Sequence, residues 1–161
     1  MNEKKTKENP HCVEESKVQI SQLMVPNQAN PAGNVHGGTV MKLIDEAAYI
    51  VASKHTHKNC VTASVDRIDF LKPVYIGNVV VARSSINYTG NTSMEVGVRV
   101  EAECLKTGKI THVASAYLTF VSLDEEGKPT KIPEIVPETK KEKRRHKEAQ
   151  QRIKARKERM P

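Results

Sequence analysis

Apolar positions between residues 38 and 54 repeat with the period of an α-helix. Polar side chains, among them Lys42 and Glu46, collect on the opposite side of the same helix. The aliphatic stripe follows the i, i+3, i+4, i+7, i+8, i+11 spacing and consists of Val40, Leu43, Ile44, Ala47, Ala48 and Val51. This pattern predicts one long helix with a single buried face.

Period-two patterns flank the helix and predict β-strands. In residues 92–105, apolar residues from Met94 to Cys104 alternate with polar ones such as Glu95, which indicates one buried and one solvated face. A change of phase near Asp66 and Arg67 predicts a β-bulge. The expected strands span about 17–25, 60–70, 74–88, 92–105 and 109–123. Short turns between consecutive strands predict an antiparallel sheet with the helix across its apolar face, which is an α+β fold.

The charge of the chain is concentrated at its C-terminal end. Residues 138–161 carry 11 Lys or Arg and 4 Asp or Glu, and this excess accounts for the whole net charge of +7. We therefore expect a disordered N-terminus at 1–15, one globular domain at 16–125 and a basic, partly helical tail at 126–161. The tail is expected to be a solvated helical or frayed segment, and the alternative is an electrostatic role toward a polyphosphate ligand or nucleic acid.

Composition disfavours several classes of protein. No apolar run approaches the roughly 20 residues of a transmembrane helix, and the polar first twenty residues predict no secretory signal. The odd number of cysteines, Cys12, Cys60 and Cys104, favours reduced thiols in a cytoplasmic protein. Nucleic-acid binding is disfavoured because the body of the chain lacks a basic stripe and aromatic residues make up only 4% of the sequence.

A glycine pair, Gly37-Gly38, precedes the predicted helix, and two adjacent acids lie within it. Glycines let a ligand approach the free N–H groups of a helix start, whose partial positive charge favours an anion. Glu46 lies on the polar side and is expected to pair with Lys42. Asp45 lies at the shoulder of the apolar arc and is expected to be half-buried. A half-buried carboxylate needs a partner or a catalytic role, so Asp45 is a candidate catalytic residue.

Two histidine features carry less weight. His36 lies in the glycine-rich turn and is a candidate base, although a hydrogen bond to the backbone is the simpler role. The spacing His55-x-His57-x-x-Cys60 has no second pair of ligands, so no metal site is predicted.

Three segments of the chain resemble a known family. They are N-x-x-G-N-V-H-G-G-x-x-M-K-L-I-D-E-A-A (Asn30 to Ala48), VTASVDRIDFLKPVYIGNVV (61–80) and TGNTSMEVGVRVEAE (89–103). In this order and spacing they resemble the hot-dog-fold acyl-CoA thioesterases. More narrowly they resemble the cytosolic acyl-CoA hydrolase branch, with its YciA-like and brain acyl-CoA hydrolase-like members. The resemblance covers residues 15–125.

The resemblance implies a hot-dog fold, in which an antiparallel sheet wraps a long central helix. It also implies homodimers assembled as hexamers (trimers of dimers), with the active site shared between two subunits. The implied reaction is hydrolysis of a fatty acyl-CoA to free fatty acid and CoA. No cofactor is needed, since CoA is part of the substrate and the product. Alternatives are a non-catalytic acyl-CoA-binding protein on the same fold and a hot-dog dehydratase.

The resemblance further implies residue roles. Asn34 matches the family's catalytic asparagine, Asp45 its helix acid, and Gly37 and Gly38 the turn that receives the thioester carbonyl. Asp45 would act as a general base toward water or attack the carbonyl to form a transient anhydride, and both routes remain open. The stretch expected to flank the CoA arm is Asn91, Thr92 and Ser93.

Overall fold

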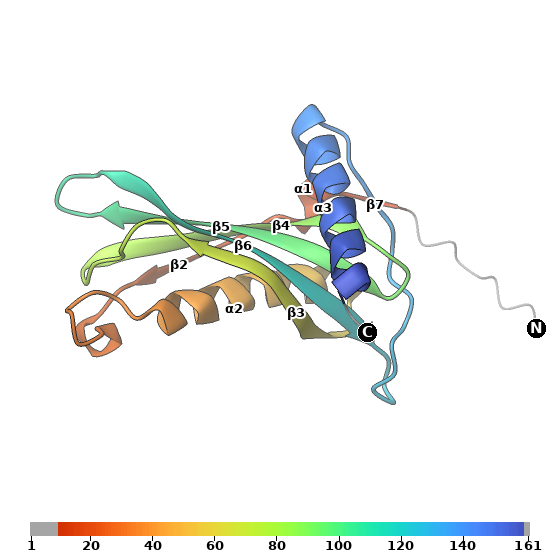
Figure 1. The fold of residues 1–161 in the computed structure, drawn as a ribbon, viewed down its shortest axis with the longest axis horizontal. Helices are drawn as coiled ribbons and strands as arrows, with labels where there is room; N and C mark the ends of the chain where they lie inside the picture. The colour runs from red at the N-terminus through yellow and green to blue at the C-terminus, as the bar shows by residue number, and fades with distance from the viewer. Residues whose placement is uncertain (1–9, 160–161) are drawn as a thin grey trace, which may run out of the picture.

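The computed structural model describes residues 10–159, and a five-stranded antiparallel sheet curves around one long helix, α2 (Gly37–Thr56) (Figure 1). The strand order is β2-β4-β5-β6-β3, so β2 and β3 are the two edges. A short 3-10 helix, η1 (Pro26–Gln28), lies in the loop between β2 and α2. The strands are β2 (Val18–Leu23), β3 (Asn59–Phe70), β4 (Asn78–Thr89), β5 (Ser93–Cys104) and β6 (Ile110–Leu123). The expected α+β architecture is confirmed.

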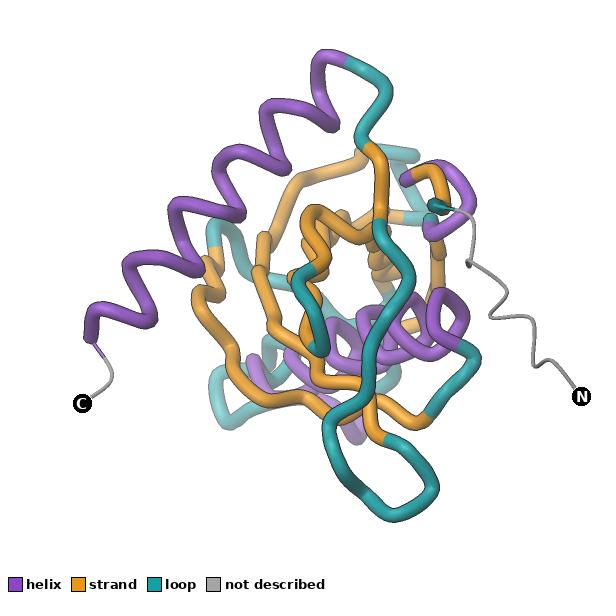
Figure 2. The backbone as a smooth tube through the Cα atoms, turned by 90° about the vertical axis from the view of Figure 1, so that its right-hand side faces the viewer, coloured by secondary structure: helices purple, strands orange, loops and turns teal. Residues whose placement is uncertain are grey.

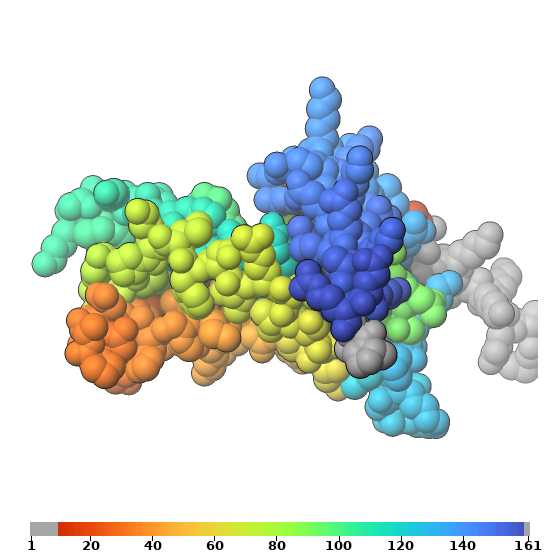
Figure 3. All heavy atoms as spheres, in the orientation of Figure 1, coloured from red at the N-terminus to blue at the C-terminus, as the bar shows by residue number. Residues whose placement is uncertain are grey.

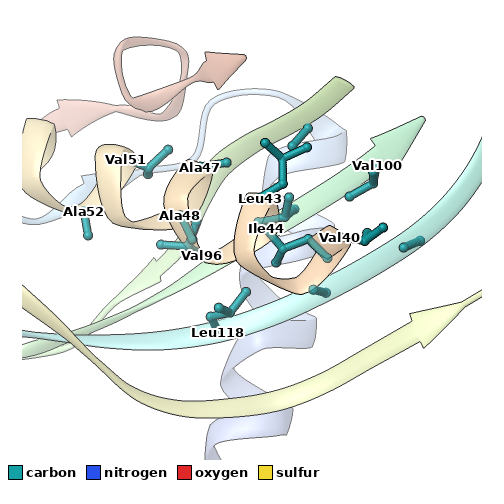
Figure 4. Packing of buried hydrophobic residues seen from close by; sticks show 14 of the residues in the cluster. Val40, Leu43, Ile44, Ala47, Ala48, Val51, Ala52, Val96, Val100 and Leu118 are labelled. Atoms are coloured by element: carbon teal, nitrogen blue, oxygen red, sulfur yellow. The ribbon is translucent and has the colours of Figure 1, made fainter. Parts of the chain in front are cut away.

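The predicted apolar stripe of α2 forms the centre of the core (Figure 4). All six of its residues are buried, and Ile44, Ala47 and Val51 are 0% exposed. They pack against aliphatic side chains of the central strands, such as Val96 of β5 and Leu118 of β6. Burial of this face fixes the rotation of α2 about its axis. The rotation in turn determines where the other side chains of the helix point.

β3 pairs with β6 through two irregularities. One register shift lies between Thr62 and Ser64, and the other lies between Val65 and Arg67. The second shift confirms the bulge predicted from the change of phase in the sequence. The first is invisible in the sequence because Thr, Ala and Ser are compatible with either face of a strand. Each bulge adds one residue and turns the side chains that follow it onto the opposite face of the sheet.

Residues 11–15, which the sequence predicts to be disordered, are ordered, together with Ser16. β1 (His11–Cys12) pairs in parallel with β7 (Ile135–Val136), and α1 (Val13–Ser16) follows directly. The buried Ser16 hydroxyl accepts a hydrogen bond from the backbone N–H of Ile86 at 3.1 Å. This order depends on partners far along the chain, which local composition does not reveal. Residues 1–9 of the predicted disordered segment lie outside the described part of the chain.

The basic tail forms α3 (Lys140–Arg159), which lies across the outer face of the sheet (Figure 2). Arg152 donates hydrogen bonds to the two carboxylate oxygens of Glu95 on β5, at 3.0 and 2.7 Å. Arg156 donates to both oxygens of Asp66 on β3, each at 3.0 Å. Ala149, between the helix and the sheet, is 0% exposed. The predicted helix is present. The expectation that it is solvated is wrong for one of its faces, because acids on the outer face of the sheet bind Arg152 and Arg156.

Glu95 is the buried acid beneath α3, although the alternating pattern places it on the solvated face of β5. Its side chain is 0% exposed, and Asn87 of β4 donates it a further hydrogen bond at 3.0 Å. Burial by itself lowers the pKa of Arg152, but the hydrogen bond and charge of Glu95 outweigh this effect and the pKa is raised. The same guanidinium lies 3.7 Å from the centroid of the Tyr117 ring. Loss of Arg152 would leave the buried carboxylate of Glu95 without its charge partner.

Gly97 in β5 leaves room for the side chain of Asn87. A Cβ atom at position 97 would lie 2.7 Å from the Asn87 amide nitrogen. We expect Gly97→Ala to displace this side chain, break its bond to Glu95 and lower the free energy of unfolding by about 1–2 kcal/mol, measured by urea denaturation. Gly90→Ala is the control, because its Cβ would meet its nearest neighbour at 3.5 Å. Equal losses in the two variants would contradict this explanation.

Candidate active site

The loop before α2 is held in shape by the side chain of Asn30. Its Oδ1 accepts hydrogen bonds from the backbone N–H groups of Ala32 at 3.0 Å and Asn34 at 3.1 Å. Gly33, between them, has a φ of +85°, a conformation that glycine adopts without strain. Asn34 also forms an isolated β-bridge with Tyr75, which ties the loop to the segment ahead of β4. The loop and the start of α2 lie together at one end of the molecule (Figure 3).

The helix α2 begins with an open N-terminus. His36 is the N-cap residue, and its side chain makes no capping hydrogen bond, while its backbone oxygen accepts from Thr39 at 3.0 Å. Among the described residues, no partner is found for the N–H groups of Gly37 and Gly38. A Cβ on Gly38 would meet nothing within 4 Å, whereas one on Gly37 would meet the Phe70 ring at 3.7 Å. The helix start therefore offers two N–H donors to an approaching oxyanion.

Asp45 lies two turns into α2, on the flank that faces β3. The hydroxyl of Thr62 donates a hydrogen bond to its Oδ1 at 2.7 Å, and none of the described residues donates to Oδ2. The expected half-burial is not observed in the single chain: Asp45 is exposed. β3 is an edge strand, and among residues 10–159 no further strand continues the sheet on this side. Glu46 lies 3.7 Å from Lys42, which confirms the predicted pair. The two adjacent acids thus have different neighbours.

The stretch Asn91, Thr92 and Ser93 lies at the opposite end of the sheet from the start of α2 (Figure 1). The backbone oxygen of Thr92 accepts from Ser122 at 3.1 Å, and Ser122 pairs with Cys60 near the beginning of β3. Within one chain, the fold therefore does not bring residues 91–93 together with Asn34, the glycine pair or Asp45.

The sequence pattern assigns no role to two polar residues of this region, Thr62 and Asn30. Thr62 belongs to the predicted strand, but alternation alone does not show that it faces Asp45. Its direction depends on the bulge that follows it. Asn30 is the first residue of the segment 30–48 that resembles the family. It lies in a Pro- and Gly-rich loop, where an asparagine side chain often hydrogen-bonds the backbone. Only the tertiary contact between α2 and β3 identifies Thr62.

His55 and Cys60, the candidate metal ligands, have other surroundings. His55 is buried, with its Nε2 2.9 Å from the backbone oxygen of Pro133, and Cys60 is buried next to Thr56. In residues 10–159, no group of three or more His, Cys, Asp or Glu side chains is arranged to hold a metal ion. No helix in the same range is long and apolar enough to cross a membrane.

Comparison with known proteins identifies the class. The family model of the thioesterase superfamily matches residues 32–109. An uncharacterized acyl-CoA thioester hydrolase of Bacillus subtilis, YkhA, is 42% identical over 154 residues, which cover 96% of this chain and 89% of that protein. The cytosolic acyl coenzyme A thioester hydrolase of Rattus norvegicus is 42% identical over 145 residues, which cover 89% of this chain and 38% of that protein.

Solved structures agree with this assignment. A hexameric acyl-CoA thioesterase in its apo form superimposes with a TM-score of 0.90 at 39% identity, covering 93% of this chain and 96% of that one. An acyl-CoA hydrolase from Staphylococcus aureus, solved with butyryl coenzyme A, coenzyme A and coenzyme A disulfide, gives a TM-score of 0.87 at 39% identity, with 94% and 92% covered. Variants of that hydrolase with an aspartate, an asparagine or a threonine replaced by alanine also match.

The chain belongs to the thioesterase superfamily. Its fold is the hot-dog fold, which it shares with a hexameric thioesterase of Campylobacter jejuni at 33% identity and a TM-score of 0.67. The fold expected from the resemblance of the sequence segments is confirmed.

Proposed function

We propose that this protein is an acyl-CoA thioesterase that hydrolyses a fatty acyl-CoA to the free fatty acid and CoA in the cytoplasm, without a cofactor. The observation that carries the proposal is the Asp45 carboxylate, held at Oδ1 by Thr62 on the exposed flank of α2. The relatives named as acyl-CoA hydrolases at about 40% identity support the substrate class.

The proposed reaction uses one carboxylate and one pair of backbone donors. Asp45 removes a proton from water, and the oxygen of that water bonds to the thioester carbonyl carbon. The N–H groups of Gly37 and Gly38 stabilise the oxyanion that forms, a contribution of about 3 kcal/mol for a single donor. The C–S bond then breaks and CoA leaves as the thiolate, which takes up the proton. Because Thr62 occupies Oδ1, Oδ2 is the oxygen available to the water.

The distance along α2 supports a site shared between two subunits. Gly38 and Asp45 are seven residues apart in this helix, which corresponds to roughly 10 Å along its axis. The attacking water must lie within hydrogen-bonding distance of the base, and the carbonyl oxygen within about 3 Å of the donors. The free N–H groups at the start of α2 point along the helix axis, away from Asp45. Two antiparallel copies of α2 would instead place the start of one beside the acid of the other.

The surface around Asp45 is suited to such a partner. β3 is an edge strand, and three of its apolar side chains are exposed, Val61 by 40%, Val65 by 47% and Phe70 by 51%. Exposed apolar residues on a free strand edge mark an interaction surface. We propose that two chains meet along β3 and that three such dimers form a hexamer. Relatives that are hexameric support the number of subunits.

Assembly with neighbouring subunits would give residues 91–93 a site to serve. In one chain this turn lies at the opposite end of the sheet from the start of α2. It is therefore remote from any substrate bound at Gly37 and Gly38 of the same chain. We propose that Asn91, Thr92 and Ser93 contact the CoA arm of a substrate bound at a site of a neighbouring subunit.

The loop asparagine of the site is either Asn34 or Asn30. The resemblance assigns the role to Asn34. In the Staphylococcus aureus hydrolase, the replaced asparagine precedes the replaced aspartate by 15 residues, and the replaced threonine follows that aspartate by 17. In this chain the same intervals separate Asn30 from Asp45 and Asp45 from Thr62. These intervals support Asn30 as the residue whose amide orients the water or the carbonyl.

Replacement of each asparagine by aspartate tests the two assignments. Aspartate keeps the oxygen acceptors that shape the loop, removes the N–H₂ donors and adds one negative charge, which is the same in both variants. We expect Asn30→Asp to lower kcat by about 10²-fold and Asn34→Asp to change it less than about threefold, because only a lost contact to the reacting groups weakens the transition state. Steady-state kinetics with one acyl-CoA measures both. The reverse order would assign the role to Asn34, and two unaffected variants would remove the loop amide from the mechanism.

The activity itself is tested by the release of free thiol from a series of acyl-CoA substrates of increasing chain length. Turnover that is lost in Asp45→Asn supports the proposal. A protein that is stabilised against heat by acyl-CoA but releases no thiol with any chain length is instead the non-catalytic acyl-CoA-binding protein.

A further inference from the structure

We propose that Arg156 of α3 is a positioning residue for the active site: through Asp66 it holds the bulged segment 62–67 of β3 in the register that presents Thr62 to Asp45. This inference rests on the proposed function, because it assigns the basic helix a role in the geometry of the base.

The bulge between Thr62 and Ser64 determines which face of the sheet Thr62 points to. Thr62 lies opposite Phe120 of β6, which is buried against the helix side of the sheet, whereas Ser64 lies opposite Thr119. Adjacent residues of β6 point to opposite faces, so Thr62 and Ser64 do as well. In a regular strand, two residues separated by one would share a face. Thr62 therefore reaches Asp45 only while this bulge is in place.

On the outer face of the sheet, Asp66 and Arg156 connect β3 to α3. Asp66 accepts hydrogen bonds from Ser64 at 3.3 Å and Thr119 at 2.9 Å, and from Arg156 at 3.0 Å to each oxygen. Arg156 also donates to Thr119. The side chain of Asp66 is only 10% exposed, so its charge needs the guanidinium. Asp66 itself lies in the second register shift of β3, four residues from Thr62.

Within residues 10–159, β3 pairs with β6 alone, and each bulge interrupts that pairing. A partner chain along β3 would meet the free edge of this strand and not its bulged pairing with β6. The segment is instead fixed from both faces, by the Thr62–Asp45 hydrogen bond on the inside and by the Asp66–Arg156 pair on the outside. We infer that loss of the outer contact lets the bulges relax and moves the Thr62 hydroxyl away from Asp45.

Arg152 provides a matched control on the same helix. It lies one turn before Arg156 and binds the carboxylate of Glu95, which is fully buried. Glu95 belongs to β5, an inner strand paired on both sides, and not to the strand that carries Thr62. Replacement of either arginine by glutamine removes one charge from α3 and breaks one ion pair with the sheet. Arg152 also lies over the Tyr117 ring of β6, but among the described residues it makes no hydrogen bond to β3. Of the two arginines, only Arg156 hydrogen-bonds the bulged segment of β3.

The experiment compares Arg156→Gln, Arg152→Gln, Thr62→Val and the double variant Arg156→Gln/Thr62→Val. We expect Arg156→Gln to lower kcat about tenfold with little change in KM, because a small misplacement of a catalytic group is sufficient for such a loss. Arg152→Gln should lower Tm more, since Glu95 is the more deeply buried acid, and leave kcat within about twofold. In the Thr62→Val background, Arg156→Gln should cause no further loss of kcat.

A second measurement does not depend on activity. Amide hydrogen exchange of residues 62–66 should be faster in Arg156→Gln than in the wild type and unchanged in Arg152→Gln. Arg156→Lys, which keeps the charge, should recover most of kcat and serves as the test if the glutamine variant does not fold.

Three results would overturn the inference: a wild-type kcat in Arg156→Gln, equal losses of kcat in the two arginine variants, or losses that multiply in the double variant. Failure of the proposed function is a separate result, since it appears as undiminished thiol release in Asp45→Asn. An Asp45→Asn variant without activity, together with unchanged exchange of residues 62–66 in Arg156→Gln, would reject the role of Arg156 alone.

Discussion

Replacement of Asp45 by asparagine is expected to lower kcat for acyl-CoA hydrolysis by at least about 10²-fold, because a positioned general base typically contributes that much to the rate. Asparagine has nearly the same shape and can still accept the Thr62 hydrogen bond at its carbonyl oxygen, so the fold and substrate binding should be retained. The measurement is thiol release under saturating acyl-CoA, with the Tm of each variant as a check on folding.

Glu46→Gln is the matched control for this variant. Glu46 is the next residue of the same helix, and the structure pairs it with Lys42 at 3.7 Å on the solvated side. An exposed i, i+4 pair contributes only a few tenths of a kcal/mol, so kcat should stay within about threefold of the wild type. Equal losses in the two variants, or full activity in Asp45→Asn, would remove Asp45 from the role of base.

Mixing two inactive variants is expected to restore about a quarter of wild-type activity. One carries Asp45→Asn, and the other carries alanine at the essential loop asparagine, Asn30 or Asn34. If each site takes its asparagine from one subunit and Asp45 from the other, a mixed dimer has one site with both defects and one with neither. With equal amounts and random pairing, about half of the dimers are mixed, which gives the expected quarter.

The control for this experiment is a proof of subunit exchange. One variant carries an affinity tag, and co-purification of the untagged chain shows that mixed oligomers have formed. If both residues act within one subunit, every site in a mixed dimer contains one defect, and no activity returns. Background activity after demonstrated exchange would therefore reject the shared site.

Periodicity predicted the central architecture because the relevant contacts repeat along the chain. The stripe from Val40 to Val51 has the spacing of one helix face, and all of its residues are buried. The alternation from Met94 to Cys104 matches β5, and the change of phase near Asp66 matches the second bulge of β3. In each case the spacing of apolar residues that are close in sequence predicts the element, because the hydrophobic effect buries these side chains together.

On the outer face of the sheet, periodicity does not predict which residues are buried. Glu95 has the position of a solvated residue in the alternating pattern, yet it is 0% exposed under α3. A charged residue on a polar face is compatible with water or with a buried partner, and only the docking of Arg152 decides between them. The excess charge of the tail was visible in the sequence, but its attachment to the sheet was not.

The candidate site divides in the same way. The sequence by itself determined that a glycine pair begins the long helix, that Asp45 lies on its shoulder, and that Glu46 faces Lys42, since helix geometry relates residues a few positions apart. The tertiary structure alone decided that Thr62 holds Asp45 and that residues 91–93 lie at the opposite end of the sheet. It also decided that Arg156 anchors the strand bearing Thr62. These relations join segments far apart in the chain, and their geometry depends on bulges and on the docking of a helix, which leave no periodic trace in the sequence.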